Sequence, residues 1–172
     1  GMQTREEDVI SNIFVANTHT TLLVFTDRGK VLWVKVHRLP LGTRTSKGKS
    51  INNEVQLEGK EKVMAILPIE SFETEENVVF VTKAGIIKKT SIKEFSRPRA
   101  NGIIALKTDL EDSLMDVRLS SGAGDIFLST KSGMSIRFSE TNVRAMGRTA
   151  RGVKGITLAK DDEVVGLAVF EK

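Results

Sequence analysis

Two residue types are absent from the 172-residue sequence, cysteine and tyrosine, and each absence excludes a class of chemistry. Without cysteine there are no disulfides, thiolate metal sites or cysteine nucleophiles, a composition that fits a reducing compartment. Without tyrosine, no tyrosyl nucleophile can attack a phosphodiester. Long apolar runs are also missing, since none approaches the ~18 residues of a membrane span. The acidic start, GMQTREEDV, is unlike a signal peptide.

Histidine and carboxylate patterns give no support for a catalytic or metal site. His19 precedes an apolar run and is expected in a turn, and His37 has no carboxylate near it in the sequence. The acidic cluster at 109–112 lacks the spacing and closing glutamate of a calcium loop. The glycine-rich segment 147–155 lacks the Gly-Lys-Ser/Thr ending of a phosphate loop. We therefore expect surface histidines, a solvated acidic turn and no catalytic or metal-binding residue.

The sequence does contain an internal repeat. Three segments share an apolar run followed by Thr (Ser-Thr in the third), two polar or small residues and Gly: 22–29, 78–85 and 126–133. A second glycine follows the first after 17 to 19 residues, at Gly48, Gly102 and Gly152. Around it, RTSKG nearly duplicates RTARG, and the middle copy is a looser relative. Such self-similarity predicts a repeat architecture.

Each repeat has the pattern of β-structure. Runs rich in Val, Ile, Leu and Phe flank a glycine turn, as in a β-hairpin, and a further run and a last strand follow the second glycine. About four strands in roughly 50 residues is the size of a propeller blade. Only single helical turns fit, at 92–95 and 141–146. The pattern predicts an all-β, propeller-like fold in one domain, with blades at 22–69, 70–119 and 120–172.

The start of the chain resembles the end of a repeat. Residues 6–10 are similar to 161–165, the turn that enters a last strand. We therefore interpret 1–21 as the last strand of a preceding blade, and the chain as a segment of a longer repeat protein, about half of a closed ring. The alternative is that 6–16 form an edge strand of a self-contained domain.

The net charge of +4 conceals two opposed populations. Segments 28–49, 82–107 and 131–154 hold 20 basic and 2 acidic residues, and the remaining 100 residues hold 6 and 20. Stacked repeats would align the basic segments into a stripe, the footprint of a polyanion site. Since the few aromatics fall in apolar strand patterns, base stacking is poorly supported, and duplex DNA bound through its phosphates is favoured. The alternative is that these side chains only solubilise exposed strands and loops.

Three segments closely resemble the C-terminal domain of bacterial DNA gyrase A. They are FTDRGKV at 25–31, IKKT with the following EF at 87–95, and above all RAMGRTARGVKG at 144–155. The resemblance covers essentially the whole chain, and the corresponding polypeptide of topoisomerase IV matches less closely. It implies a β-pinwheel, a six-bladed disc whose adjacent blades exchange strands, of which this chain would supply about three four-stranded blades.

The resemblance also implies a function and partners. Duplex DNA would wrap around the basic rim and so support ATP-dependent negative supercoiling by the parent type II topoisomerase in the bacterial cytoplasm. The chain itself would be non-catalytic and hold no cofactor, because ATP and Mg²⁺ serve the parent complex elsewhere. Its partners would be duplex DNA, the remainder of gyrase A and the gyrase B polypeptide, with no membrane.

Two features depart from the family pattern. The Gln-Arg-Arg-Gly-Gly-type basic box of the family is absent, and we expect it just upstream of Gly1 in the parent protein. Trp33 stands at the position that Lys89 and Arg137 occupy in the other repeats, so it either packs or stacks against a sugar edge.

Basic residues of the three repeats are the candidate DNA contacts. The rival hypothesis is a protein-interaction propeller whose basic stripe docks an acidic partner; an enzyme domain with an unrecognised site is a third, which the residue inventory argues against. An open blade edge tends to pair with another chain, so the fragment could form a homodimer. The expected rim contacts are Lys88, Lys89, Arg97, Arg99, Arg137, Arg148, Arg151 and Lys154, and the expected loop contacts are Arg44, Lys47 and Lys49.

Overall fold

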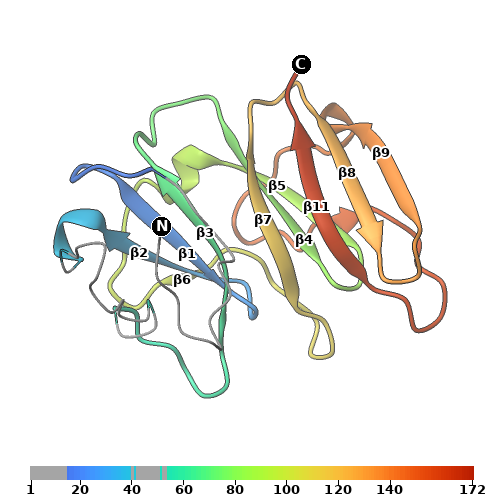
Figure 1. Cartoon of the computed structure of the whole chain (residues 1–172), viewed down its shortest axis with the longest axis horizontal. Coiled ribbons are helices and arrows are strands. Elements are labelled where there is room, and N and C mark those ends of the chain that lie inside the picture. The colour runs from blue at the N-terminus through green and yellow to red at the C-terminus, as the bar shows by residue number, and fades with distance from the viewer. Residues whose placement is uncertain (1–14, 40, 42–50, 52–53) are drawn as a thin grey trace, which may run out of the picture.

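The computed structural model describes residues 15–39, 41, 51 and 54–172, which form β-strands joined by turns and short 3₁₀ turns (Figure 1). The all-β fold is therefore confirmed. The first repeat contains β1 (Thr21–Thr26), β2 (Lys30–Lys35), η1 (Val36–Arg38) and β3 (Val63–Ile69). The second contains β4 (Asn77–Thr82), β5 (Ile86–Ser91), η3 (Ile92–Phe95), β6 (Ile103–Ile104) and β7 (Leu114–Ser120). The third contains β8 (Asp125–Thr130), β9 (Ser135–Ser139), η4 (Glu140–Asn142), β10 (Val153–Lys154) and β11 (Val164–Phe170).

The recurring threonine and glycine build the same hairpin turn in each repeat. The Thr82 hydroxyl accepts a hydrogen bond from the Ile86 amide at 3.1 Å, and the Gly85 amide donates to the Thr82 carbonyl at 3.0 Å. Gly85 has φ of +88°, a left-handed conformation that glycine adopts without steric cost. The turns at 26–30 and 130–134 repeat this arrangement. Threonine and glycine thus recur in the sequence because each hairpin turn needs them.

The sheets do not coincide with the sequence repeats. Sheet one has the order β3-β1-β2-β6 and sheet two the order β10-β5-β4-β7, so each takes one edge strand, β6 or β10, from the following repeat. Sheet three has the order β11-β8-β9, and among the described residues no fourth strand joins it. Neighbouring repeats therefore exchange a strand. We call the segments that follow the second glycine, 103–106 and 153–158, the exchange segments.

Two apolar layers join the three sheets, which lie side by side (Figure 1). Between sheets one and two, the fully buried rings of Phe25, Phe80 and Phe95 contact one another with centroids 5.4 to 6.4 Å apart. Burying each such side chain contributes roughly 1.5–3 kcal/mol. Trp33 packs against this layer and its indole Nε1 donates to the Phe95 carbonyl at 2.9 Å, so it packs rather than presenting a stacking surface. The layer between sheets two and three is aliphatic, built around Val79, Val81, Ile87, Ile126 and Leu128.

The acidic turns hold the hairpin turns of their own repeats. Asp112 accepts a hydrogen bond from the Ala84 amide at 3.0 Å. Asp162 accepts from both the amide and the hydroxyl of Ser132, at 2.9 and 2.6 Å, and the hydroxyl bond is the main cause that lowers the Asp162 pKa to about 2. These carboxylates therefore help to form the turns. His19 and His37 are both exposed at the surface, as expected.

Some sequence expectations fall outside the described residues. The proposed last strand of a preceding blade lies mostly in 1–14, so its interpretation as a blade remnant or an edge strand stays a prediction. The expected helical turn at 92–95 is present as η3, whereas the one expected at 141–146 is the shorter η4 at 140–142, and η1 is a further turn that the sequence pattern did not indicate. In the part of the chain that is described, no helix has the length and apolarity to cross a membrane.

Candidate nucleic-acid interface

Two basic loops, 96–102 and 144–152, cross neighbouring sheets at equivalent places. A Cβ on Gly102 would lie 2.6 Å from the Val31 carbonyl oxygen, and one on Gly152 would lie 2.5 Å from the Ile87 carbonyl oxygen. Each loop backbone therefore passes too close to the second hairpin strand of the preceding repeat for any other residue. This close approach explains the second glycine of the second and third repeats, and it gives both loops the same place on successive sheets.

The loop side chains are mostly exposed. Arg97 and Arg99 lie exposed on the first loop. On the second loop, the Arg151 side chain is 79% exposed, with Nη1 3.9 Å from an Asp109 carboxylate oxygen. The Arg148 side chain is 33% exposed, and its Nε lies 3.8 Å from the carboxylate of Glu94. At these distances and exposures the carboxylates neutralise the two arginines only weakly.

Arg151 also belongs to a groove that joins all three repeats. Arg28, Lys107 and Arg151 line one pocket of about 280 Å³ together with Asp109. Arg28 comes from the first hairpin turn, Lys107 follows the first exchange segment, and Arg151 lies on the second basic loop. Three cations and one carboxylate thus face one hollow. Sequence reasoning left Arg28 and Lys107 out of the candidate set, although they are the outermost residues of two basic stretches.

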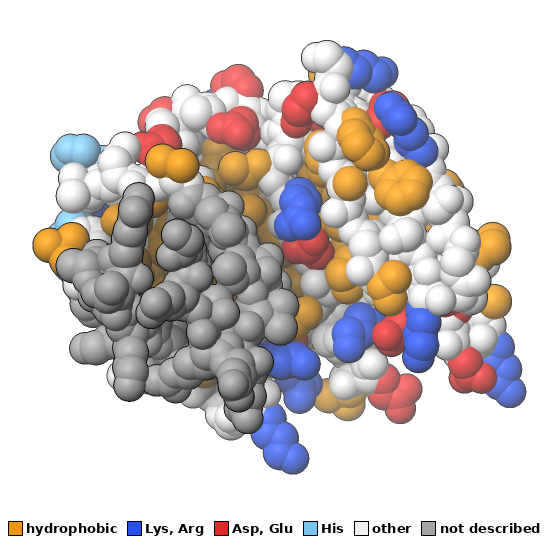
Figure 2. Space-filling view, in the orientation of Figure 1, with side chains coloured by type: hydrophobic (Ala, Val, Ile, Leu, Met, Phe, Trp, Pro, Cys, Tyr) orange, Lys and Arg blue, Asp and Glu red, His pale blue; other side chains and the backbone are white. Residues whose placement is uncertain are grey.

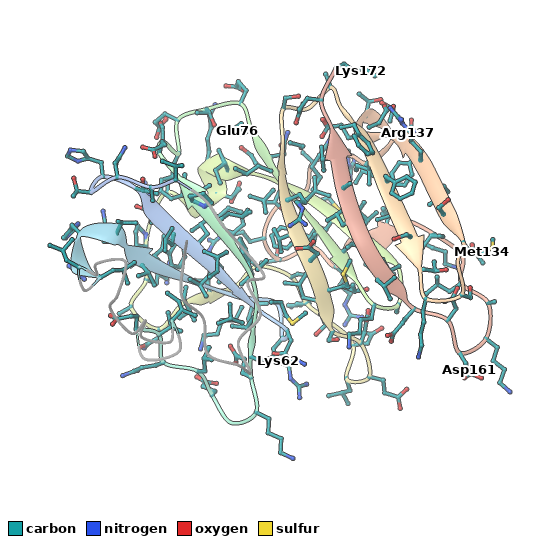
Figure 3. The ribbon with its side chains drawn as sticks, in the orientation of Figure 1. Lys62, Glu76, Met134, Arg137, Asp161 and Lys172 are labelled. Carbon is teal, nitrogen blue, oxygen red and sulfur yellow. The ribbon has the colours of Figure 1, made fainter. Side chains whose placement is uncertain are left out.

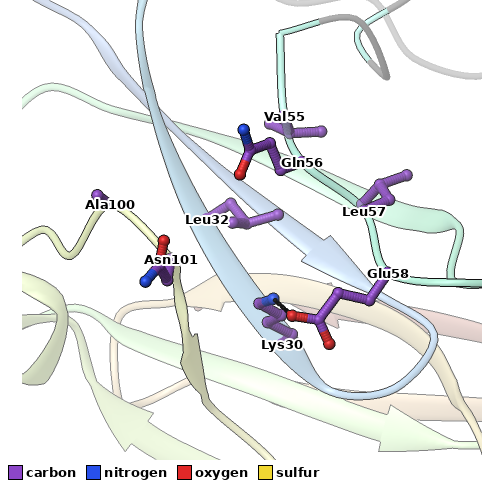
Figure 4. A pocket seen from close by; sticks show the side chains of 8 residues that line it. All are labelled: Lys30, Leu32, Val55, Gln56, Leu57, Glu58, Ala100 and Asn101. Atoms are coloured by element: carbon purple, nitrogen blue, oxygen red, sulfur yellow. Dashed lines mark hydrogen bonds and ion pairs between the residues drawn. The ribbon is translucent and has the colours of Figure 1, made fainter.

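The groove continues toward the first sheet. Arg28 also lines a neighbouring pocket of about 470 Å³ with Lys30 and Glu58. Beyond it, another hollow is bounded by Lys30 and Glu58 on one side and by Ala100 and Asn101 on the other (Figure 4). Here the Lys30 ammonium pairs with Glu58 at 3.3 Å. The more weakly neutralised part of the groove is therefore around Lys107 and Arg151.

Lys88 and Lys89 are not on the surface. Lys88 is 0% exposed, and its Nζ donates to the carbonyl oxygens of Ala105 at 2.8 Å and Arg148 at 2.7 Å. Burial, assisted by the charge of Arg148, lowers its pKa from 10.5 to about 8. Lys89 is 6% exposed and donates to the Glu140 carbonyl at 3.0 Å. Their placement on an exposed rim is wrong, because both side chains are buried and their ammonium groups donate to backbone carbonyls of neighbouring segments.

A family model described as "DNA gyrase C-terminal domain, beta-propeller" matches residues 20–70, 76–121 and 124–171, which are the three repeats. The chain belongs to this DNA gyrase C-terminal domain family. The gyrase A protein of Salmonella typhimurium is 47% identical over 96% of the chain, and that of Staphylococcus aureus is 43% identical over 98%. The chain spans 19% of the length of each of these proteins.

Solved structures of related domains have the same fold. The C-terminal domain of DNA topoisomerase IV has a TM-score of 0.83 and 32% identity, with 91% of this chain and 49% of that one covered. A DNA gyrase A C-terminal domain has a TM-score of 0.73 and 20% identity, with 90% and 49% covered, and this likeness supports the fold alone. The β-pinwheel architecture expected from the resemblance is confirmed, in a chain about half as long as these solved domains.

The remaining DNA contacts predicted from the sequence do not all lie together in this gyrase C-terminal domain. Lys154 is exposed on β10, beside the second loop. Arg137 lies on sheet three, where its Nε binds Asp125 at 3.0 Å and its guanidinium lies 5.0 Å from the Phe170 ring centroid. Figure 3 places Arg137 and Lys172 at the same end of that sheet, and both pair with Asp125. Arg44, Lys47 and Lys49 lie outside the described residues.

The visible face of the gyrase C-terminal domain chain in Figure 2 carries basic and acidic side chains close together. Positive charge is therefore concentrated on the two loops and in the groove, and not over that whole face. Among the described residues, no group of histidines and carboxylates is arranged to hold a metal ion. What the loops and groove offer is clustered, exposed positive charge, which suits the backbone of a polyanion.

Proposed function

We propose that this domain binds duplex DNA through its phosphates, without sequence preference, as a non-catalytic part of a type II DNA topoisomerase. The observation that carries the proposal is the convergence of Arg28, Lys107 and Arg151 in one groove between three repeats. Lys and Arg contacts to phosphate fix the position of a duplex and carry no sequence information. The relatives are gyrase A proteins, which supports DNA as the polyanion.

The proposed contact set differs from the one drawn from the sequence. Lys88 and Lys89 are left out because their ammonium groups are buried. Arg137 is secondary because it is already engaged by Asp125 and Phe170. Arg44, Lys47 and Lys49 remain proposed contacts of the first repeat. The central contacts are Arg28, Arg97, Arg99, Lys107, Arg148, Arg151 and Lys154.

In the parent protein, bound DNA would follow the basic loops from one repeat to the next. Because the loops occupy equivalent places on successive sheets, a duplex that contacts one is led to the other, and further repeats would extend the path. We propose that DNA bent along this path assists negative supercoiling. ATP, Mg²⁺ and the cleaving residues would then lie in the remainder of gyrase A and in the gyrase B polypeptide. The chain covers about a fifth of its relatives, which leaves ample length for those functions.

The experiment is a charge reversal on the second loop. A variant with Arg148→Glu and Arg151→Glu should bind two duplexes of unrelated sequence more weakly, by similar factors of roughly tenfold or more, because phosphate contacts are sequence-blind. A matched control carries Lys60→Glu and Lys160→Glu, which reverse two exposed charges in turns outside the basic stretches. An equal loss in the control, or a loss on one sequence alone, would overturn the proposal.

A further inference from the structure

The buried ammonium of Lys88 connects two walls of the basic groove. One of its acceptors, the Ala105 carbonyl at 2.8 Å, lies two residues before Lys107. The other, the Arg148 carbonyl at 2.7 Å, lies three residues before Arg151. Lys107 and Arg151 both line the groove. One side chain therefore holds the backbone next to both of these cations, although it belongs to neither segment.

The neighbouring residue, Lys89, makes two more contacts, one with this loop and one with η4 just before it. The Met146 amide donates to the Lys89 carbonyl at 2.7 Å, and the Lys89 ammonium donates to the Glu140 carbonyl at 3.0 Å. The segment from 140 to 148 is thus attached to β5 at three places, and Lys88 supplies the one closest to Arg151.

The strand itself does not require a lysine at this position. The residues three places after the hairpin glycine in the other repeats are Leu32 and Ile136, and Leu32 is buried in an apolar cluster. A buried ammonium is costly unless its donors are satisfied, and burial lowers the Lys88 pKa. A charged group thus replaces an apolar one where two carbonyl groups of different repeats must be held together.

We propose that Lys88 is a positioning residue that sets the geometry of the basic groove by binding the carbonyl oxygens of Ala105 and Arg148. The consequence for DNA rests on the proposed function. Direct contact with phosphate is excluded in this conformation by the complete burial of the side chain. The role is to hold Lys107 and Arg151 at a fixed spacing, so that less conformational freedom is lost when a polyanion binds.

The first experiment is a double-mutant cycle on duplex affinity. Lys88→Met should weaken duplex binding by roughly fivefold to tenfold when it is the only substitution in the chain. The same change should have little effect when Arg151 and Lys107 are already alanine, because the residue acts through them. Lys160→Met, an exposed lysine outside the groove, is the control that should change little in either background. Equal losses in both backgrounds, or no loss in either, would contradict the positioning role.

The second experiment does not depend on DNA. Amide hydrogen exchange at Met146 and Ala150, which are hydrogen-bonded in the free chain, should accelerate in Lys88→Met while the amides of β4 keep their rates. Lys88→Leu, which installs the residue found in the first repeat, is a second variant that suits a buried strand site. Unchanged exchange in the loop would overturn the proposal. If the parent chain binds no duplex, the proposed function fails, and the exchange data still decide whether Lys88 holds the loop.

Discussion

Val153 lies directly opposite Ile87 in the register of β10 with β5, so a strand of the third repeat completes the sheet of the second. Ile103 lies opposite Val31 in the same way. Because the basic loops lead directly into these strands, the strand exchange that joins the repeats also places the loops. The packing between repeats and the proposed DNA surface are therefore parts of one arrangement, and changes to the first should affect the second.

The hairpin glycines allow the contribution of an exchange segment to be measured. Gly85 and Gly133 have similar φ values, +88° and +91°. A Cβ on Gly85 would lie 2.8 Å from the Ile156 side chain, whereas at Gly133 nothing lies within 4 Å. We expect Gly133→Ala to cost about 1 kcal/mol of unfolding free energy for backbone strain, and Gly85→Ala about 2 kcal/mol more. Denaturant unfolding followed by circular dichroism measures both, and equal losses would contradict this interpretation of strand exchange.

The hydrogen bond from Trp33 to Phe95 should contribute to stability. Trp33→Phe keeps an aromatic ring but removes the donor to the Phe95 carbonyl, and we expect a loss of about 1–3 kcal/mol. Since Trp33 is the single tryptophan, unfolding must be followed by far-ultraviolet circular dichroism in both proteins. An unchanged denaturation midpoint would mean that this contact contributes nothing.

Lys88 should make stability depend on pH in the alkaline range. Its pKa falls from 10.5 in an exposed lysine to about 8 in the folded chain. Between these values the unfolded chain binds more protons than the folded one, so the Lys88 contribution to stability rises with pH, by at most ~1.4 kcal/mol per pH unit. Below about pH 8 both states are protonated and the contribution is constant. Measuring the unfolding free energy of the unsubstituted chain and of Lys88→Met from pH 7 to 10.5 isolates this contribution. Stability curves that run parallel across this range would contradict it.

The sequence predicts much of the fold because the repeat records turn chemistry. Threonine and glycine recur where a hairpin needs a hydroxyl acceptor and a left-handed residue, and both features are present in the turn at 82–86. The pairing of β6 with β2 could not be read from strand patterns alone, because a two-residue strand has no distinctive periodicity. The resemblance to a strand-exchanging family was needed to expect it.

The candidate site was harder to predict, because basic residues in a strand do not reveal their burial. Trp33, an apparent exception to a basic pattern, and Lys89 have the same role: each donates a side-chain N–H to a carbonyl in the 3₁₀ turn of the next repeat, at Phe95 and Glu140. The shared feature of the position is a long side chain with a donor. The sequence shows the positive charge at this position in two repeats, but it does not show the shared hydrogen bond. Whether such a side chain is exposed depends on the neighbouring sheets, which a single sequence does not reveal.

The central claim is that the loops and the groove bind duplex DNA through phosphates. The most direct test is the affinity of the chain for a duplex at several salt concentrations. Each phosphate contact releases about 0.9 counterion, so four to seven contacts should give a slope of about −4 to −6 when the logarithm of the binding constant is plotted against the logarithm of the salt concentration. The slope should be the same for duplexes of unrelated sequence. An affinity that stays flat as salt increases would contradict the account.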